Sequence, residues 1–192
     1  MFLIRRGTSV PSTKALLRRS VAPWLAAALF SPLAQAALHV GDSAPGFTTQ
    51  AAVAGKAFDF DMAAALKKGP VVLYFFPKAF TQGCTLEAHA FAEATPRFAA
   101  MGATVVGMSH DDIATLKRFS TEACRDQFAV ASDPQAATIK AYDAAAAANP
   151  QRAERISYVI GQDGRIKFVH IGSDPLEHVK QTQAAVKQLS GK

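Results

Sequence analysis

Hydrophobic positions along the chain alternate between short unbroken runs and helical spacings. The run Val71–Phe76, bounded by Pro70 and Pro77, is typical of a strand buried on both faces at the centre of a sheet. After it, apolar residues recur over 86–98 with the period of one helix face, and Pro96 predicts a kink or a division there. The same reasoning predicts further strands over 103–109 and 128–131 and helices over 81–100, 112–124 (capped by Asp111) and 136–142.

Two β-branched runs near the C-terminus, 156–160 and 166–170, flank the turn sequence Gly161-Gln162-Asp163-Gly164. A short turn containing Asp-Gly between two such runs predicts a β-hairpin. A final amphipathic helix over 175–189 follows, and the alanine run 144–148 predicts helix or loose surface. Parallel strand–helix units followed by an antiparallel hairpin predict an α/β fold whose mixed central sheet is flanked by helices.

The first 36 residues differ in character from the rest. Five basic residues precede the apolar stretch Val21–Leu33, which ends in Ala34-Gln35-Ala36. This order is typical of a secretory signal peptide, so we expect a leader over 1–36, cleavage near Ala36/Ala37, one domain over 37–192 and a periplasmic or secreted protein. An uncleaved membrane anchor stays open as the alternative, and the Arg18-Arg19 pair leaves both the general secretory and the twin-arginine routes open.

The charge of the chain follows the same division. The whole chain carries a formal net charge of +6, but residues 37–192 hold 16 basic and 15 acidic residues, a net charge of +1. The basicity belongs to the leader, so we expect no nucleic-acid partner. Two cysteines exclude a disulfide-rich scaffold and a four-cysteine zinc site, and we expect neither a metal nor a cofactor.

The candidate chemistry lies at Cys84, where the central strand ends and a helix begins. With Thr81 as the N-cap, Cys84 is the third helical residue, where free backbone N–H groups and the helix dipole favour a thiolate. The Thr81 hydroxyl, three residues earlier, lies on the same face and can bond the thiolate or an oxygen approaching it. Pro77 fixes the turn and shields one side. The alternative is that Cys84 is an inert buried residue.

The segment Pro77-x-x-x-Thr81-x-x-Cys84, followed by Thr85-x-Glu87, resembles the active-site motif of the peroxiredoxins, with the bacterioferritin-comigratory-protein or Q-type subgroup as the nearest match. The resemblance implies a thioredoxin-like, three-layer fold and the reduction of hydrogen peroxide or organic hydroperoxides by a thiol. It extends over about 38–189 and includes Gly41-Asp42-x-Ala44-Pro45-x-Phe47, Ser132-Asp133-Pro134 and Arg155-Ile156-Ser157-Tyr158-Val159-Ile160.

The resemblance also assigns roles to residues. Cys84 would be the peroxidatic nucleophile that becomes a sulfenic acid, Thr81 would bond the peroxide, and Arg155 would hold both thiolate and peroxide. Independently of the resemblance, the place of Glu87 in the first helical turn predicts that it supports the helix dipole and helps to orient Arg155 or a neighbour. The implied partners are a small-molecule peroxide and a thioredoxin-like or other thiol reductant. We expect a monomer without stable membrane association after cleavage.

The resolving cysteine departs from the pattern of the subgroup. Many Q-type members carry a second cysteine five residues after the first, where this chain has His89. The remaining thiol is Cys124, forty residues after Cys84, which we expect to form an intramolecular disulfide with it; a one-cysteine mechanism is the alternative. The second functional hypothesis is a periplasmic copper-binding or copper-delivery module that uses Cys84 and His89, with Cys124 as a further soft ligand.

Overall fold

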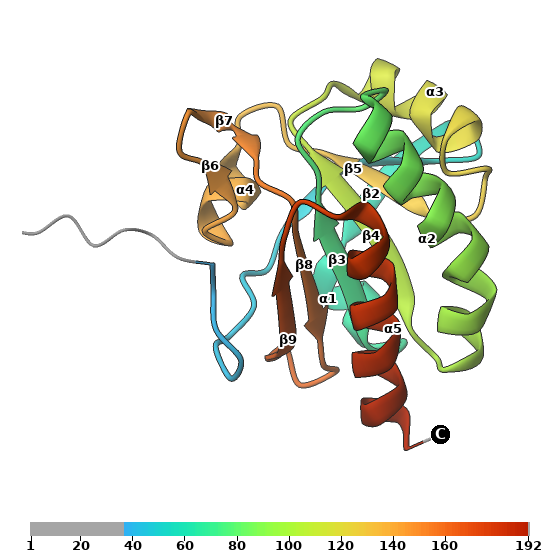
Figure 1. Cartoon of the computed structure of the whole chain (residues 1–192), viewed down its shortest axis with the longest axis vertical. Coiled ribbons are helices and arrows are strands. Elements are labelled where there is room, and N and C mark those ends of the chain that lie inside the picture. The colour runs from blue at the N-terminus through green and yellow to red at the C-terminus, as the bar shows by residue number, and fades with distance from the viewer. Residues whose placement is uncertain (1–36, 192) are drawn as a thin grey trace, which may run out of the picture. The chain divides into compact units, whose positions relative to one another are not determined.

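The computed structural model describes residues 37–191, which form a central sheet between two layers of helices (Figure 1). The strands are β1 (Thr48–Val53), β2 (Lys56–Asp61), β3 (Val71–Phe75), β4 (Thr104–Ser109), β5 (Ala129–Ser132), β6 (Ala145–Ala146), β7 (Asn149–Ala153), β8 (Ile156–Ile160) and β9 (Ile166–Ile171). The helices are α1 (Met62–Leu66), α2 (Gln82–Ala100), α3 (Ile113–Glu122), α4 (Ala137–Ala141) and α5 (Pro175–Ser190).

The main sheet has seven strands in the order β2-β1-β5-β4-β3-β8-β9. Its centre is parallel, because β3, β4 and β5 run in one direction, whereas the pairs at both sides are antiparallel. β6 and β7 form a separate two-stranded sheet. The predicted mixed sheet, with parallel units first and the hairpin β8–β9 last, is confirmed.

Strand β3 separates two hydrophobic cores, and each of its residues is fully buried. Val72 and Tyr74 belong to the core under α2, α3 and α5, whereas Val71 and Leu73 belong to the core under α1 and α4. This division follows from the period of two along a strand, and it confirms the prediction of a strand buried on both faces. Helices α2 and α5 lie next to each other on the first face (Figure 1).

Several local predictions are wrong in detail. Helix α2 continues through Pro96, so the predicted alternative of a division there is wrong, and the alternative of a kink stays a prediction. Helix α3 is capped by Asp112, whose carboxylate accepts from the Thr115 N–H at 2.7 Å, and not by Asp111. Within the alanine run, residues 145–146 form strand β6, because they pair with β7 in a hairpin instead of following their helix propensity.

The proposed leader lies outside the described residues, so its structure and its cleavage stay predictions. Within 37–191, none of the helices has both the length and the apolar character needed to cross a bilayer.

Candidate active site

The N-terminus of α2 fixes the position of Cys84. The chain leaves β3 at Phe75, turns over residues 76–81 and enters α2 with Cys84 as its third residue, as the sequence predicts. The first helical hydrogen bond runs from the Thr85 N–H to the Thr81 carbonyl at 2.9 Å. The N–H groups that precede Thr85 therefore have no helical acceptor, and the partial positive charge of the helix end lies beside the sulfur.

Arg155 reaches Cys84 from a neighbouring strand. It immediately precedes β8, and the register pairs Ile156 with Phe75, so that Arg155 arrives beside the end of β3. Its Nη2 lies 3.5 Å from Cys84 Sγ, and its side chain is 11% exposed. A Cβ at Gly83 would lie 3.2 Å from this nitrogen, so the glycine leaves room for the guanidinium.

Glu87 binds the other arm of the guanidinium. Arg155 Nη1 donates to Glu87 Oε2 in a buried hydrogen bond, which confirms the predicted contact between these two residues. Burial raises the pKa of Glu87 to about 8, although the Arg155 charge and hydrogen bond act to lower it. The second carboxyl oxygen, Oε1, has no hydrogen-bond partner among the described residues.

His178 lies behind Glu87, with its Nδ1 4.0 Å from Oε1. Its Nε2 lies 3.0 Å from the Gly172 carbonyl, which only accepts, so this nitrogen carries the proton. The Ser157 hydroxyl, 2.8 Å from Nδ1, then donates to it. Burial lowers the pKa of His178 to about 4, which keeps the ring neutral. Spacing along the sequence did not reveal this residue, because its partners come from two other elements.

A buried aspartate holds the turn before α2. Asp111 Oδ2 accepts from the Ala79 N–H at 2.7 Å and from the Ser109 hydroxyl at 2.8 Å. In the same turn Phe80 has a positive φ of 64°, a strained conformation for a residue with a side chain, and its ring lies against Phe119 at 5.2 Å. The sequence misassigned Asp111 as a helix cap. Its place after β4, the parallel neighbour of β3, is the signal that could have identified it.

Thr81 and Pro77 lie near the thiol but do not bond it. The Thr81 hydroxyl donates to the Lys78 carbonyl at 3.0 Å. It therefore does not make the hydrogen bond to the Cys84 sulfur that was one of its two predicted contacts. Pro77 and Arg155 line an open cleft of about 420 Å³ together with residues of the β9–α5 connection. This cleft gives a small molecule access to the guanidinium from solvent.

Cys124 lies in a different setting, two residues after the end of α3. It is fully buried, and burial, with a smaller contribution from Asp126, raises its pKa strongly. Both cysteines are free thiols. The next residue, Arg125, pairs with Glu93 on α2 at 3.1 Å, so the Cys124 segment contacts that helix well beyond Cys84. The structure therefore places Arg155 in contact with the Cys84 sulfur, but it shows no such contact between the two cysteines.

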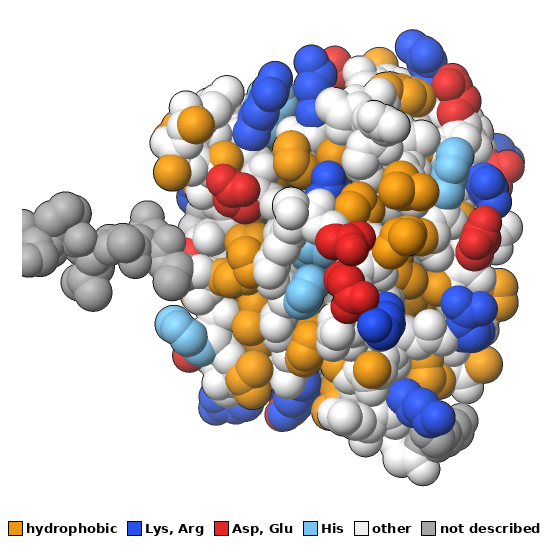
Figure 2. All heavy atoms as spheres, in the orientation of Figure 1, with side chains coloured by type: hydrophobic (Ala, Val, Ile, Leu, Met, Phe, Trp, Pro, Cys, Tyr) orange, Lys and Arg blue, Asp and Glu red, His pale blue; other side chains and the backbone are white. Residues whose placement is uncertain are grey.

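The described residues hold no group of three His, Cys, Asp or Glu side chains suited to a metal ion. His89, the proposed copper ligand, lies half-buried in α2. On the face shown in Figure 2, basic side chains are interspersed with acidic and hydrophobic ones, which fits the small net charge of residues 37–192.

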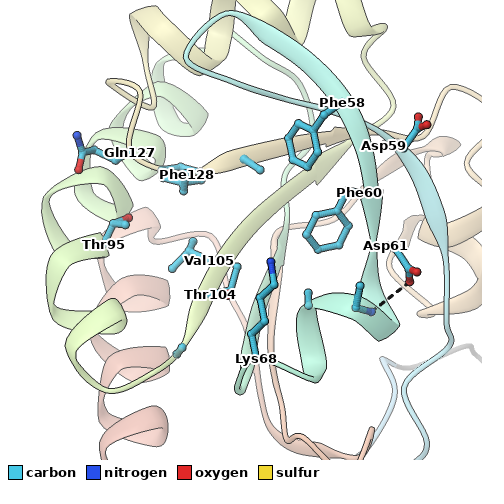
Figure 3. A pocket seen from close by; sticks show the side chains of 14 residues that line it. Phe58, Asp59, Phe60, Asp61, Lys68, Thr95, Thr104, Val105, Gln127 and Phe128 are labelled. Carbon is cyan, nitrogen blue, oxygen red and sulfur yellow. Dashed lines mark hydrogen bonds between the residues drawn. The ribbon is translucent and has the colours of Figure 1, made fainter.

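A second cavity, of about 460 Å³, lies at the opposite end of the sheet from Cys84. It is lined by residues from β2, α1 and the starts of β4 and β5, among them Phe60, Val105 and Phe128 (Figure 3). Because β3 and β4 are parallel, the start of β4 is remote from the end of β3, where Cys84 follows. This cavity contains no thiol, so the candidate chemistry stays at the N-terminus of α2.

A thiol at a helix N-terminus beside a buried guanidinium, on a mixed sheet between helices, defines a thiol-dependent oxidoreductase of the thioredoxin-like class. The crystal structure of peroxidoxin BcpB from Mycobacterium tuberculosis superposes with a TM-score of 0.72 at 25% identity, over 79% of this chain and 98% of that one. A PrxQ variant of Xylella fastidiosa has the same fold, with a TM-score of 0.71 at 23% identity, over 81% of this chain and 99% of that one.

Sequence comparison identifies the family. The family model described as AhpC/TSA matches residues 40–169. A chloroplastic peroxiredoxin Q of Oryza sativa subsp. japonica is 30% identical over 150 residues, which make up 78% of this chain and 67% of that relative. The chain belongs to the AhpC/TSA family, as a peroxiredoxin of the Q type. It is therefore a thiol peroxidase, which uses a peroxide and a thiol reductant, and the resemblance seen in the sequence is confirmed.

Proposed function

We propose that Cys84 is the peroxidatic residue of this thiol peroxidase and that Arg155 and the first turn of α2 keep it reactive. The observation that carries the proposal is the 3.5 Å contact between Arg155 Nη2 and Cys84 Sγ. A guanidinium and a helix N-terminus both favour the anion over the thiol. The alternative of an inert buried cysteine is disfavoured, because such residues lie in apolar surroundings without a cationic partner.

The peroxide step follows from this geometry. The Cys84 thiolate attacks the terminal oxygen of the peroxide, which keeps its hydrogen, and the O–O bond breaks, so that Cys84 becomes a sulfenic acid. The departing alkoxide or hydroxide takes a proton from water and leaves as an alcohol or as water. Negative charge moves from sulfur to oxygen during this step. Arg155 and the Cys84 N–H are in position to stabilise that charge, and rotation of the Thr81 hydroxyl away from the Lys78 carbonyl provides one more donor.

The substrates are hydrogen peroxide and organic hydroperoxides, which enter through the cleft lined by Pro77 and Arg155. The cleft is lined by Ile171, 60% exposed, as well as by Ser173. This mixture of apolar and polar lining suits an organic group on one peroxide oxygen as well as a hydrogen atom. Pro77 contributes a rigid wall without an N–H donor.

Cys124 is the resolving residue in this proposal. The Cys124 sulfur attacks the sulfur of the Cys84 sulfenic acid, the S–O bond breaks, and the oxygen leaves as water with the Cys124 proton. A disulfide requires Cα atoms within about 7 Å, so the first turns of α2 unwind before the bond forms. A thioredoxin-like or other thiol donor then reduces the disulfide, and the protein works as a monomer.

The protein is exported in this proposal, with residues 1–36 as a cleaved signal peptide. The support is the order of basic residues, apolar stretch and Ala34-Gln35-Ala36. An oxidising compartment makes the thiol donor the limiting partner, because free thiols there are re-oxidised unless a dedicated donor supplies electrons.

The test of the peroxidatic role compares two single variants. In a dithiothreitol-driven peroxide-consumption assay we expect Cys84→Ser to abolish turnover, and we expect Cys124→Ser to keep the first oxidation of Cys84 while it slows or stops turnover. One equivalent of peroxide, followed by mass-spectrometric mapping, should yield an 84–124 disulfide in the unsubstituted protein. Retained turnover in Cys84→Ser would contradict the peroxidatic role, and absence of the linkage would contradict the resolving role.

The test of export uses the full-length chain expressed with its leader. We expect an N-terminus near Ala37 by mass spectrometry of the soluble periplasmic fraction. A full-length chain recovered with the membranes would instead support the uncleaved anchor.

A further inference from the structure

Tyr74, in the centre of β3, carries a buried hydroxyl that is unlike those of the other two tyrosines. All three side chains are fully buried. Tyr142 donates to the Pro45 carbonyl at 2.8 Å, and Tyr158 donates to the Tyr142 carbonyl at 2.7 Å. The Tyr74 hydroxyl has no partner among the described residues. A buried hydroxyl without a partner destabilises the folded state, so this one needs an explanation.

The ring of Tyr74 contacts both segments that carry a cysteine. It stacks on Phe91, seven residues after Cys84 in α2, with ring centroids 4.3 Å apart. It also meets the edge of Phe128, four residues after Cys124, at 5.9 Å. Tyr74, Cys84 and Cys124 belong to one hydrophobic cluster. The phenol therefore lies between the two segments that the resolving step must bring together.

Electrostatics agrees with this placement. Burial raises the pKa of Tyr74 well above its ordinary value, Cys124, Glu87 and Cys84 raise it further in that order, and Arg155 lowers it. The hydroxyl is thus within electrostatic range of both sulfurs. It also keeps its proton at any pH at which the enzyme works, so it can act only as a neutral donor or acceptor.

The distance that the resolving step must cover passes along the same stretch of α2. The Arg125–Glu93 ion pair shows that the Cys124 segment lies beside α2 at a position nine residues after Cys84, which corresponds to roughly 13 Å along a helix axis. Phe91, on which Tyr74 stacks, lies close to that ion pair in the helix. The proposed resolving step must bring the Cys84 sulfur towards Cys124 along this stretch of α2, against which Tyr74 packs.

We propose that the Tyr74 hydroxyl is the hydrogen-bond donor of the resolving step, and that it donates to the Cys124 sulfur as this attacks the Cys84 sulfenic acid. The proposal rests on the proposed resolving role of Cys124. In the resting enzyme Cys124 is buried and disfavoured as an anion, so a hydrogen-bond donor that stabilises its thiolate increases the fraction of Cys124 that can attack. The S–S bond forms, the S–O bond breaks, water leaves with the Cys124 proton, and Tyr74 retains its own proton.

The experiment measures the two chemical steps separately in Tyr74→Phe. Rapid mixing of the reduced protein with hydrogen peroxide gives the rate of Cys84 oxidation, and acid-quenched mass spectrometry gives the rate of disulfide formation. We expect the ratio of the resolving rate to the peroxide rate to fall by about tenfold or more, as for the loss of one hydrogen bond in the transition state. A longer-lived sulfenic acid, trapped by dimedone, should accompany the fall.

Tyr158→Phe is the matched control, because it removes a hydroxyl of the same kind at the same burial, but one with a partner. We expect it to lower the midpoint of urea denaturation and to leave the ratio of rates unchanged. We expect Tyr74→Phe to leave the midpoint unchanged or to raise it. An unchanged ratio in Tyr74→Phe overturns the proposal, whereas absence of the 84–124 disulfide in the unsubstituted protein overturns the proposed resolving role itself.

Discussion

The two cysteines of this chain are equally buried but lie in opposite electrostatic environments. Cys84 is 2% exposed and Cys124 is fully buried, and both side chains belong to the same hydrophobic cluster. At Cys84 a helix N-terminus and the Arg155 guanidinium supply positive charge. At Cys124 burial in the apolar interior raises the pKa, and the nearby Asp126 raises it further. Burial alone therefore does not determine reactivity; the charge that accompanies burial does.

The same contrast applies to the two arginines beside these cysteines. Arg155 has a side chain that is 11% exposed and bridges Glu87 and Cys84. Arg125 directly follows Cys124 but points to Glu93 at the surface, with 51% of its side chain exposed. A surface ion pair adds little to the free energy of folding, because water screens the attraction between its charges. A buried guanidinium interacts more strongly with neighbouring charges, because the dielectric constant around it is low.

The largest effect is expected from removing the buried guanidinium. Arg155→Ala should lower the second-order rate constant for oxidation of Cys84 by hydrogen peroxide by about a thousandfold, since a buried donor to developing charge is lost. Arg125→Ala is the matched control, and we expect its rate to stay within about twofold of the unsubstituted protein. Competition kinetics against a second peroxidase measure both. Equal effects of the two substitutions would contradict the assignment of Arg155.

A second experiment compares the two thiols directly. In the reduced protein we expect iodoacetamide to alkylate Cys84 about a hundredfold faster than Cys124, because the thiolate is the reacting form and only Cys84 has partners that favour it. Peptide mapping over a time course measures both rates in one sample. The denatured protein is the control, since there the two rates should converge. Comparable rates in the folded protein would contradict the electrostatic distinction between the sites.

The smallest effect concerns the dependence of stability on pH. The pKa of Glu87 rises from 4.5 to about 8 on burial, so between these values the folded state binds more protons than the unfolded state. Stability therefore falls as pH rises from about 5 to about 8. We expect urea denaturation to show this fall in the unsubstituted protein and to show much less of it in Glu87→Gln.

Glu93 and His178 distinguish the titration of Glu87 from other causes of a pH-dependent stability. Glu93→Gln, an exposed glutamate on the same helix, should leave the fall unchanged. His178 acts in the opposite direction: its pKa falls from 6.5 to about 4, so its contribution is lost as pH falls from about 6.5 towards 4 and does not account for a loss at higher pH. An identical pH dependence in Glu87→Gln and the unsubstituted protein would contradict the assignment.

Local pattern was sufficient for much of the fold. The apolar run of β3, the hairpin β8–β9 and the amphipathic helices α2 and α5 were predicted, because each depends on periodicity and turn residues within a short segment. The strands β1 and β2 were not predicted. Their residues alternate weakly, and β1 is held in the sheet by pairing with β5, about eighty residues away in the chain. Such long-range pairing leaves no mark on the local sequence.

The residues of the site likewise fall into those that the local sequence located and those that it missed. Cys84, Thr81 and Pro77 lie within eight residues of each other, and Arg155 stands in a recognisable segment, so motif spacing located them. Asp111 was predicted to cap a helix, which is wrong, and the contact between His178 and Ser157 was not predicted. Their contacts depend on how remote elements pack: the parallel pairing of β3 with β4 brings Asp111 to the turn before α2. The packing of α5 on β8 brings His178 to Ser157.

By itself, then, the order of residues determined a peroxiredoxin of the Q type and a cysteine in the first turn of a helix, since backbone geometry near a helix end is dictated locally. Only the tertiary structure decided that one Glu87 oxygen lies near His178 without a hydrogen bond and that both cysteines are free thiols. It also decided that Tyr74, whose hydroxyl has no partner among the described residues, packs against both cysteine-bearing segments. These are matters of desolvation and of distance between remote segments, and both arise only when the chain has packed.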